Sequence, residues 1–244
     1  MWTFEVYCNS KIIERFVSIV NYQKEAIMDY DIAMKDKDLN EFVENLVKAE
    51  NRYYQEVVIT DVKGNCPYGH QKGDSFKVTA MNSAGICGSL LKTIFGDIVT
   101  LHYGGVTLLE KDSDIINASC PEKGKVQVKI KRVEMNESEV LRTPWKFKPM
   151  TGKGYPALDK YKVCVEVTDI AVQCYWGHSV GDTFEVDPFN VGGACCFLYN
   201  QLYPYIHILL SGSVPAWSLD DHSMMGECPD VYDRLCFRLF VEER

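Results

Sequence analysis

The sequence lacks several features that define whole classes of protein. No segment approaches the roughly eighteen consecutive apolar residues that a membrane-spanning helix requires. The first residues, Met1 to Val6, lack the basic start, apolar middle and small-residue cleavage site of a secretory signal. We therefore expect a cytoplasmic protein that does not associate with membranes.

Excess positive charge is also missing. The formal net charge is -8, and no cluster of Lys and Arg is dense enough to form a basic stripe. Such a chain repels a phosphate backbone, so nucleic acid is not an expected partner. The patterns G-x-G-x-x-G and G-x4-G-K, which cradle phosphate groups, are absent as well. We therefore expect the Gly-rich segments to form turns.

Cysteine, by contrast, is abundant. The chain has 10 cysteines among 244 residues. Reducing conditions inside cells disfavour structural disulfides, and metal binding or thiol chemistry is then the usual reason for such a number. The expected function therefore depends on which cysteines belong to a pattern.

An internal repeat supplies that pattern. Shifting the sequence by 108 positions aligns two copies of one framework without a gap. The aligned residues include Cys66 with Cys174, His70 with His178, Asp74 with Asp182, Cys87 with Cys195, and Cys120 with Cys228. Cys8, Cys164, Cys196 and Cys236 have no counterpart and are expected to be structural.

The repeat predicts an α+β fold with two small modules. We expect the first Cys/His module over residues 53–134 and the second over residues 159–244. A linker rich in Pro and Gly, residues 135–158, joins them. The N-terminal helical extension covers residues 1–52. Each module is expected to be an antiparallel sheet with one packed helix. The extension has helical spacing of apolar residues in two segments, which predicts a hairpin that packs on the core or docks a partner protein. The interface between two such modules is a natural place for a shared pocket.

Within each module the pattern predicts a strand, a Gly-rich turn holding Cys and His, a second strand, a helix, a loop and a final strand. The strands are expected over 54–61, 75–79 and from 126 in the first copy, and over 162–169, 183–187 and from 235 in the second. The helix is expected to begin near Gly85 or Gly193 and to carry Cys87 or Cys195 in its first turn.

The recurrent Cys and His residues are the right number for one four-coordinate site per module. Zinc prefers tetrahedral thiolate and imidazole ligands, and Asp74 or Asp182 is placed to orient the imidazole. An iron-sulfur cluster, such as [4Fe-4S], is a competing hypothesis because thiolates also suit it. A third interpretation involves no cofactor: the cysteines are small buried apolar residues and the histidines are satisfied turn residues. The predicted ligands are Cys66, His70, Cys87, Cys120, Cys174, His178, Cys195 and Cys228.

A nucleophilic site is the alternative of a different class. Cys66 with His70, or Cys174 with His178, would form a thiolate and imidazolium pair at the module interface. The motif matches no protease or thioredoxin signature, and nothing in the sequence identifies a substrate.

The second copy resembles a known family. Its motifs are Cys174, Gly177-His178, Gly181-Asp182, Gly193-Ala194-Cys195, Leu202-Tyr203-Pro204 and Cys228-Pro229-Asp230. They are similar to those of the short prokaryotic Cys/His-motif proteins, a family without an established activity. The first copy departs from the pattern, with Phe95-Gly96 in place of Tyr-Pro and Glu122 in place of the final Asp. The resemblance implies a cytosolic protein, often from anaerobes, in which the first site is weakened.

Taken together, the residues favour a metal-binding accessory or binding protein with one Cys3His site per module and zinc as the metal. An iron-sulfur accessory subunit and a thiol-dependent enzyme remain as alternatives. A partner protein at the N-terminal helices, or a second copy of the chain, is the expected kind of binding partner.

Overall fold

The computed structural model describes residues 52–106, 112, 114–135, 141–143, 146–150, 155–218, 220–230 and 234–244. These residues belong to one compact unit, Glu50–Arg244. The helical hairpin predicted within the N-terminal extension lies outside the described residues. Among the helices that are described, none combines the length and apolar character needed to cross a membrane.

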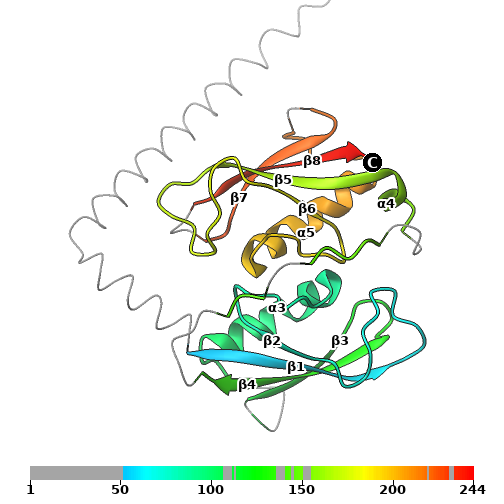
Figure 1. Ribbon diagram of the computed structural model, residues 1–244, viewed down its shortest axis with the longest axis vertical. Helices are drawn as coiled ribbons and strands as arrows, with labels where there is room; N and C mark the ends of the chain where they lie inside the picture. Colours follow the sequence, from blue (N-terminus) through cyan, green and yellow to red (C-terminus); the bar gives the residue numbers. More distant parts are fainter. Residues whose placement is uncertain are drawn as a thin grey trace, which may run out of the picture. The chain divides into compact units, whose positions relative to one another are not determined.

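The two modules are built alike, and the predicted α+β class is confirmed by two four-stranded antiparallel sheets (Figure 1). In the first module β1 (Tyr53–Val62), β2 (Ser75–Val78), β3 (Ile115–Ser119) and β4 (Val126–Glu134) form a sheet of order β2-β1-β4-β3. In the second, β5 (Tyr161–Asp169), β6 (Thr183–Val186), β7 (Ser223–Glu227) and β8 (Cys236–Glu243) repeat that order as β6-β5-β8-β7. The short helix α4 (Ala157–Lys160) leads into β5.

The edge strands β3 and β7 differ from the sequence prediction, which left both segments in a loop. Each has only five residues, and neither shows a clear alternation of apolar and polar side chains. They are held as strands by pairing with β4 and β8. Long-range pairing of this kind overrides the weak local preference.

Each sheet is covered on one face by one helix, α3 (Gly88–His102) or α5 (Cys196–Leu210). The two helices lie between the two sheets and contact one another, which gives the layer order sheet, helix, helix, sheet (Figure 1). Apolar residues recur at helical spacing on both, for example Ile94 and Ile98 in α3 and Leu202 and Ile206 in α5, and all four are buried. The two modules therefore share one continuous core.

The first residue of each helix donates a hydrogen bond across the interface to a loop of the other module. The Gly88 N–H donates to the Phe189 carbonyl (2.7 Å), and the Cys196 N–H donates to the Met81 carbonyl (3.0 Å). Each pair is the other shifted by 108 positions, so the interface has the internal symmetry of the sequence. The first N–H groups of a helix have no partner within the helix, and here the opposite module supplies one.

A close approach at this interface requires glycine at position 88. A Cβ atom there would lie 1.9 Å from the hydroxyl oxygen of Tyr199. Tyr199 is fully buried and donates a hydrogen bond to the Asp187 carbonyl (2.8 Å), so its ring has little freedom to withdraw.

We expect Gly88→Ala to lower the free energy of unfolding by about 1–3 kcal/mol, the usual cost of overpacking a core. Gly96→Ala in the same helix is the matched control, because a Cβ atom there meets nothing within 4 Å. That change should raise the free energy of unfolding by about 0.5–1 kcal/mol through the better helix propensity of alanine. Urea unfolding of both variants measures the difference, and equal stabilisation by both would contradict the close approach.

Candidate functional site

The Cys-His loop of each module is fixed by the same backbone contacts. Gly69 N–H donates to the Cys66 carbonyl and Gly177 N–H to the Cys174 carbonyl, both at 2.9 Å. Both glycines have a φ of +91°, in the left-handed region that other residues rarely adopt. These turns direct His70 and His178 back towards the core.

Both imidazole rings are buried. The side chain of His70 is 4% exposed and that of His178 is 8% exposed. Burial lowers the pKa of His70 to about 4; the charge of Asp74 opposes this shift and that of Lys148 adds to it. Burial also lowers the pKa of His178, against the opposing charge of Asp182. Both rings are therefore neutral near pH 7.

The two aspartates predicted to orient these rings lie close to them but do not hydrogen-bond to them. Asp74 Oδ2 is 3.8 Å from His70 Nδ1, and Asp182 Oδ2 is 3.9 Å from His178 Nδ1. Each carboxylate instead accepts a hydrogen bond from a backbone N–H of its own loop at 2.8 Å, from Gln71 or Ser179. The aspartates thus hold the turn and act on the rings through their charge.

The second module brings all four predicted ligands to one small cavity, here called the thiol cavity. Its volume is about 10 Å³, roughly the space of a single water molecule. Met81 of the first module also lines it. The predicted ligands that line the thiol cavity are Cys174, His178, Cys195 and Cys228.

Two features of the thiol cavity matter for its chemistry. His178 Nε2 is buried and has no hydrogen-bond partner among the described residues. A hydrogen bond with Cys228, together with burial, raises the pKa of the Cys195 thiol well above its usual value. Cys195 also caps α5, because its sulfur accepts a hydrogen bond from the Leu198 N–H (3.4 Å).

The predicted Cys and His ligands of the first module have different hydrogen bonds. His70 Nε2 accepts a hydrogen bond from the backbone N–H of Cys87 (3.2 Å), so this nitrogen is occupied. Burial raises the pKa of the Cys87 thiol to about 12, and the nearby Cys66 adds a small part of that shift. Cys120 Sγ accepts a hydrogen bond from the Val126 N–H (3.3 Å).

Ring orientation accounts for the difference between the two histidines. His178 stacks on Phe184, with ring centroids 5.1 Å apart and an interplanar angle of 13°. His70 meets the equivalent Phe76 edge-on, at 5.3 Å and 76°. In its orientation His70 receives the Cys87 N–H, whereas Nε2 of His178 stays without a partner.

Among the residues that the structure describes, no group of three or more His, Cys, Asp or Glu side chains has an arrangement that could hold a metal ion. The nine described cysteines are all free thiols. The four residues around the thiol cavity are therefore neighbours whose donor atoms do not converge on one point.

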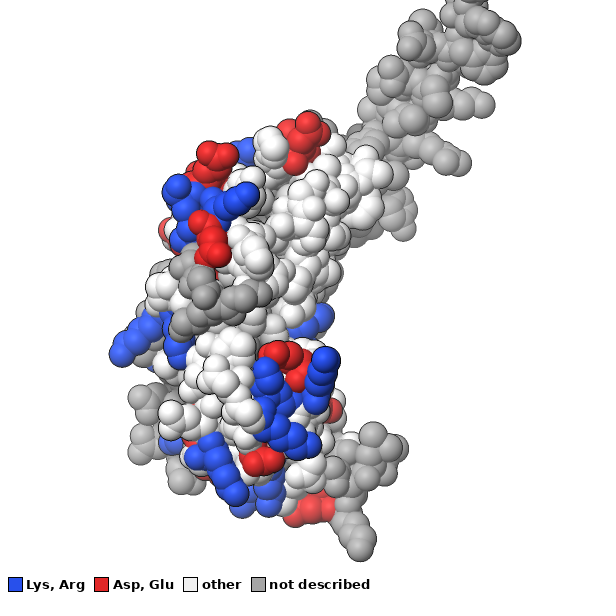
Figure 2. Space-filling model, turned by 90° about the vertical axis from the view of Figure 1, so that its right-hand side faces the viewer, with Lys and Arg blue, Asp and Glu red and all other residues white. Residues whose placement is uncertain are grey.

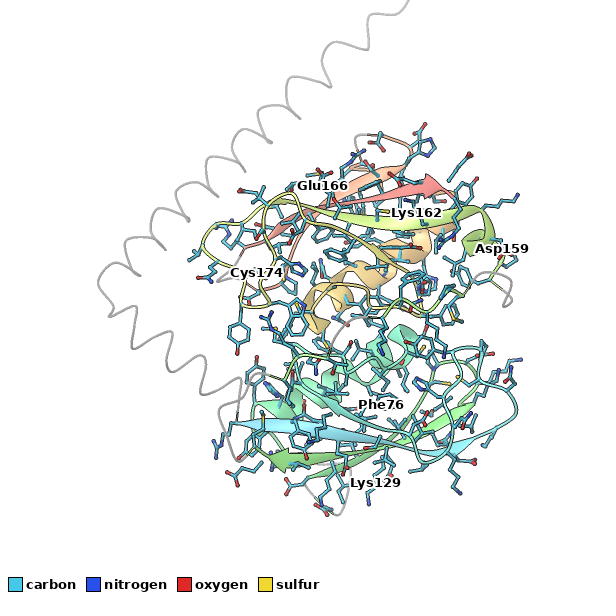
Figure 3. The ribbon with its side chains drawn as sticks, in the orientation of Figure 1. Phe76, Lys129, Asp159, Lys162, Glu166 and Cys174 are labelled. Carbon is cyan, nitrogen blue, oxygen red and sulfur yellow. The ribbon has the colours of Figure 1, made fainter. Side chains whose placement is uncertain are left out.

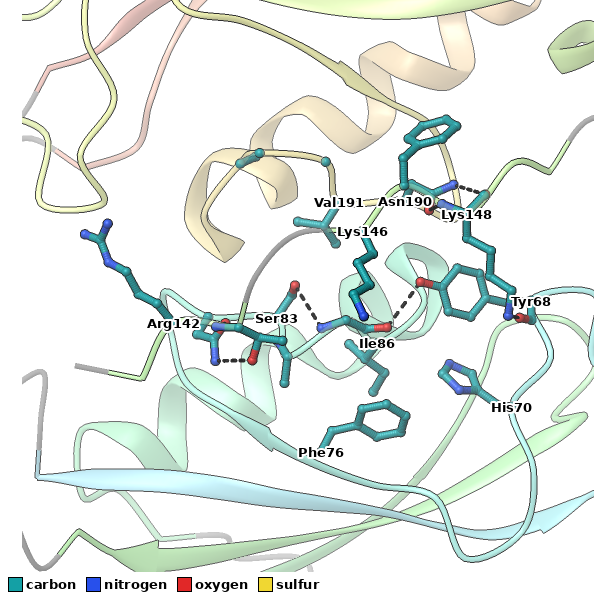
Figure 4. Close-up of a pocket in the computed structure, with 18 of the residues that line it drawn as sticks. Tyr68, His70, Phe76, Ser83, Ile86, Arg142, Lys146, Lys148, Asn190 and Val191 are labelled. Carbon is teal, nitrogen blue, oxygen red and sulfur yellow. Dashed lines mark hydrogen bonds between the residues drawn. The ribbon is translucent and has the colours of Figure 1, made fainter. Parts of the chain in front are cut away.

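A second, larger cavity of about 950 Å³ lies between the modules and is called the interface cavity (Figure 4). Both Cys-His loops, both loops that lead into the helices, and part of the linker line it. An interface pocket was expected from the duplication, but the linker residues that line it were not identified from the sequence. The segment Arg142 to Lys148, with three basic residues and no acidic one, is the signal that points to them.

Two equivalent asparagines clamp the linker over the interface cavity. Asn82 Oδ1 accepts a hydrogen bond from the Thr143 N–H (3.1 Å), and Asn190 Oδ1 accepts one from the Lys148 N–H (2.9 Å). Asn190 Nδ2 also donates to the Lys148 carbonyl (2.8 Å). Asn82 and Asn190 align with each other in the repeat, so the duplicated framework binds the linker twice.

Comparison of the chain with models of protein families, with curated proteins and with solved structures finds no match. The resemblance to the prokaryotic Cys/His-motif proteins therefore stays a prediction, and function must be argued from the geometry of the chain itself.

The buried neutral ring of His70 predicts that acid destabilises the fold. Its pKa is about 4 in the folded chain and 6.5 in an unfolded one, so between these values the unfolded chain binds more protons. The free energy of unfolding should fall as the pH drops from about 6.5 towards 4, by at most about 1.4 kcal/mol per pH unit for this one group. Urea unfolding of chelator-treated protein at several pH values measures the slope.

His70→Gln should show a smaller slope than the parent chain. His222→Gln, at an exposed position, is the control and should keep the parental slope. An unchanged slope in His70→Gln would contradict the assignment.

Proposed function

We propose that the protein is a metal-binding accessory or binding protein whose ion is held in the second module. The proposal depends on one observation: the buried His178 Nε2, without a partner among the described residues, lines the same cavity as Cys174, Cys195 and Cys228. A buried nitrogen acceptor without a partner costs free energy. Coordination by a cation would remove that cost.

The donor set favours zinc. Three thiolates and one neutral imidazole are a standard tetrahedral set for this ion. The thiol cavity has about the volume of one water molecule, which suits a single ion, whereas a four-iron cluster would have to open the core. Because the donors do not converge in the described structure, binding would require the cysteine side chains to move.

Metal binding at this cavity would be coupled to proton release. The raised pKa of Cys195 means that its thiol is protonated without metal, and zinc binds the thiolate. The affinity for the metal ion should therefore fall by about tenfold for each unit by which the pH is lowered, for each proton that the ion displaces.

The first module is a weaker candidate. Its equivalent nitrogen, His70 Nε2, already accepts the Cys87 N–H. A metal ion would have to break this hydrogen bond. We therefore propose one ion per chain rather than one per module.

The alternative of a nucleophilic cysteine has less support. Such a site needs a thiol with a lowered pKa beside a charged imidazole. Burial instead lowers the pKa of His70 and of His178, so neither imidazole is charged near neutral pH, which disfavours the ion pair in both modules.

Cobalt titration tests the proposal. Reduced, chelator-treated full-length chain should bind one Co²⁺ and develop a thiolate-to-cobalt charge-transfer absorption together with the visible bands of tetrahedral cobalt. Zn²⁺ should then displace the cobalt. Absence of these bands with a correctly folded chain would refute the proposal.

Matched variants assign the ion to a module. His178→Gln should lower the affinity for Co²⁺ by at least about tenfold, the usual loss when a metal site is damaged. His70→Gln, the same change at the equivalent position, should leave it unchanged. An equal loss in both variants, or two ions per chain, would contradict a single site in the second module.

A further inference from the structure

The interface cavity carries a local excess of positive charge, although the whole chain has a net charge of -8. Three basic side chains of the linker line it, Arg142, Lys146 and Lys148, against the single carboxylate of Asp74. Basic side chains also gather over the first module on the face shown in Figure 2. An anion entering this cavity meets a favourable field.

Two of the three cations already have partners in the cavity wall. The Arg142 guanidinium lies over the Trp176 ring at 4.8 Å and donates to the Tyr175 carbonyl at 2.9 Å. The Lys148 ammonium lies over the Tyr68 ring at 4.7 Å and donates to the Tyr68 carbonyl. These contacts hold the linker at Arg142 and at Lys148, on either side of Lys146 in the middle of this stretch.

Lys146 occupies that middle position. Its side chain extends from the linker into the cavity towards Ile86 (Figure 4). No hydrogen bond or ion pair joins it to any residue within the described ranges. It is exposed, so its ammonium group is available to a ligand without disturbing the core.

The walls around Lys146 are partly aromatic. Tyr68, Phe76 and Trp176 all line the cavity. Phe76 is drawn beside Ile86 among the lining residues in Figure 4. The Trp176 Nε1 donates to the Gly193 carbonyl (3.0 Å) and the Tyr68 hydroxyl to the equivalent Gly85 carbonyl (3.1 Å), so both rings are held in place. Tyr68 is buried beneath Lys148, whereas Phe76 and Trp176 are half-buried and present part of their rings to the cavity. Fixed aromatic rings offer stacking surfaces at low entropic cost.

We propose that the interface cavity binds a small anion of the mononucleotide type. A planar heterocycle would stack against the aromatic wall, and its phosphate group would pair with the Lys146 ammonium. The volume of about 950 Å³ is near the upper end of the usual range for ligand pockets, which is far more than inorganic phosphate alone needs. This inference is independent of the metal site, since it uses none of the four residues proposed to hold the ion.

Two ligand pairs that differ only in the phosphate group test the proposal. Flavin mononucleotide is compared with riboflavin, and adenosine monophosphate with adenosine, by isothermal titration on the full-length chain. At least one phosphorylated ligand should bind at least about tenfold more tightly than its uncharged partner, as expected for a charge-assisted contact. Its affinity should fall as salt is added.

Lys146→Ala should weaken binding of that phosphorylated ligand by about tenfold and leave the uncharged partner unaffected. Lys129→Ala is the matched control: Lys129 is exposed on the outer face of the first sheet, away from the cavity (Figure 3), and its removal should change nothing. Two results would overturn the proposal. One is that neither phosphorylated ligand binds more tightly than its partner, and the other is that Lys146→Ala binds like the parent chain.

Discussion

The hydrogen bonds from each helix start to a loop carbonyl of the other module are the constraint on which the rest of the molecule depends. Gly88 and Cys196 each donate their N–H to a carbonyl of the other module. A buried N–H without a partner is costly, so neither helix start is fully satisfied in one module alone. The contact also sets how close the helices approach, which is why Tyr199 occupies the space over Gly88.

Both cavities follow from this docking. Met81, whose carbonyl accepts the Cys196 N–H, also lines the thiol cavity, so the first module helps to enclose the cysteines of the second. On the other side the linker must cross from β4 to β5, and Asn82 and Asn190 hold it there. The interface cavity is the space that remains between the linker and the two Cys-His loops.

The sequence predicted the elements that depend on local patterns and on the repeat. The strands β1 and β5 and the turns with Gly69 and Gly177 agree with those predictions. The two central helices are present as well, but they begin at Gly88 and Cys196, so that Cys87 and Cys195 lie at the N-caps rather than in the first turn. The edge strands escaped prediction because their pairing, rather than their composition, makes them strands. The order of the layers was not predicted from the sequence either, because the contact between α3 and α5 depends on hydrogen bonds between residues about one hundred positions apart.

In the candidate sites, too, the sequence pattern predicts which residues matter but not how they pack. Self-alignment identified the four Cys and His positions of each module, and in the second module those residues do line one cavity. It gave no means to distinguish His70 from His178, which occupy identical places in the pattern. Their difference is an angle between two rings, and that angle depends on how the surrounding aromatic residues pack.

That angle explains how duplication can divide roles between two equal modules. In the edge-on orientation, His70 Nε2 accepts a hydrogen bond from the Cys87 N–H. This bond connects the Cys-His loop of the first module to the start of α3. A stacked His178 keeps its ring buried against Phe184 and its Nε2 without a partner in the described chain. The first module thereby gains a stabilising hydrogen bond, while His178 Nε2 in the second has no partner among the described residues. A buried acceptor of this kind persists when the surrounding fold is stable enough to tolerate it, and the shared core of the two modules supplies that stability.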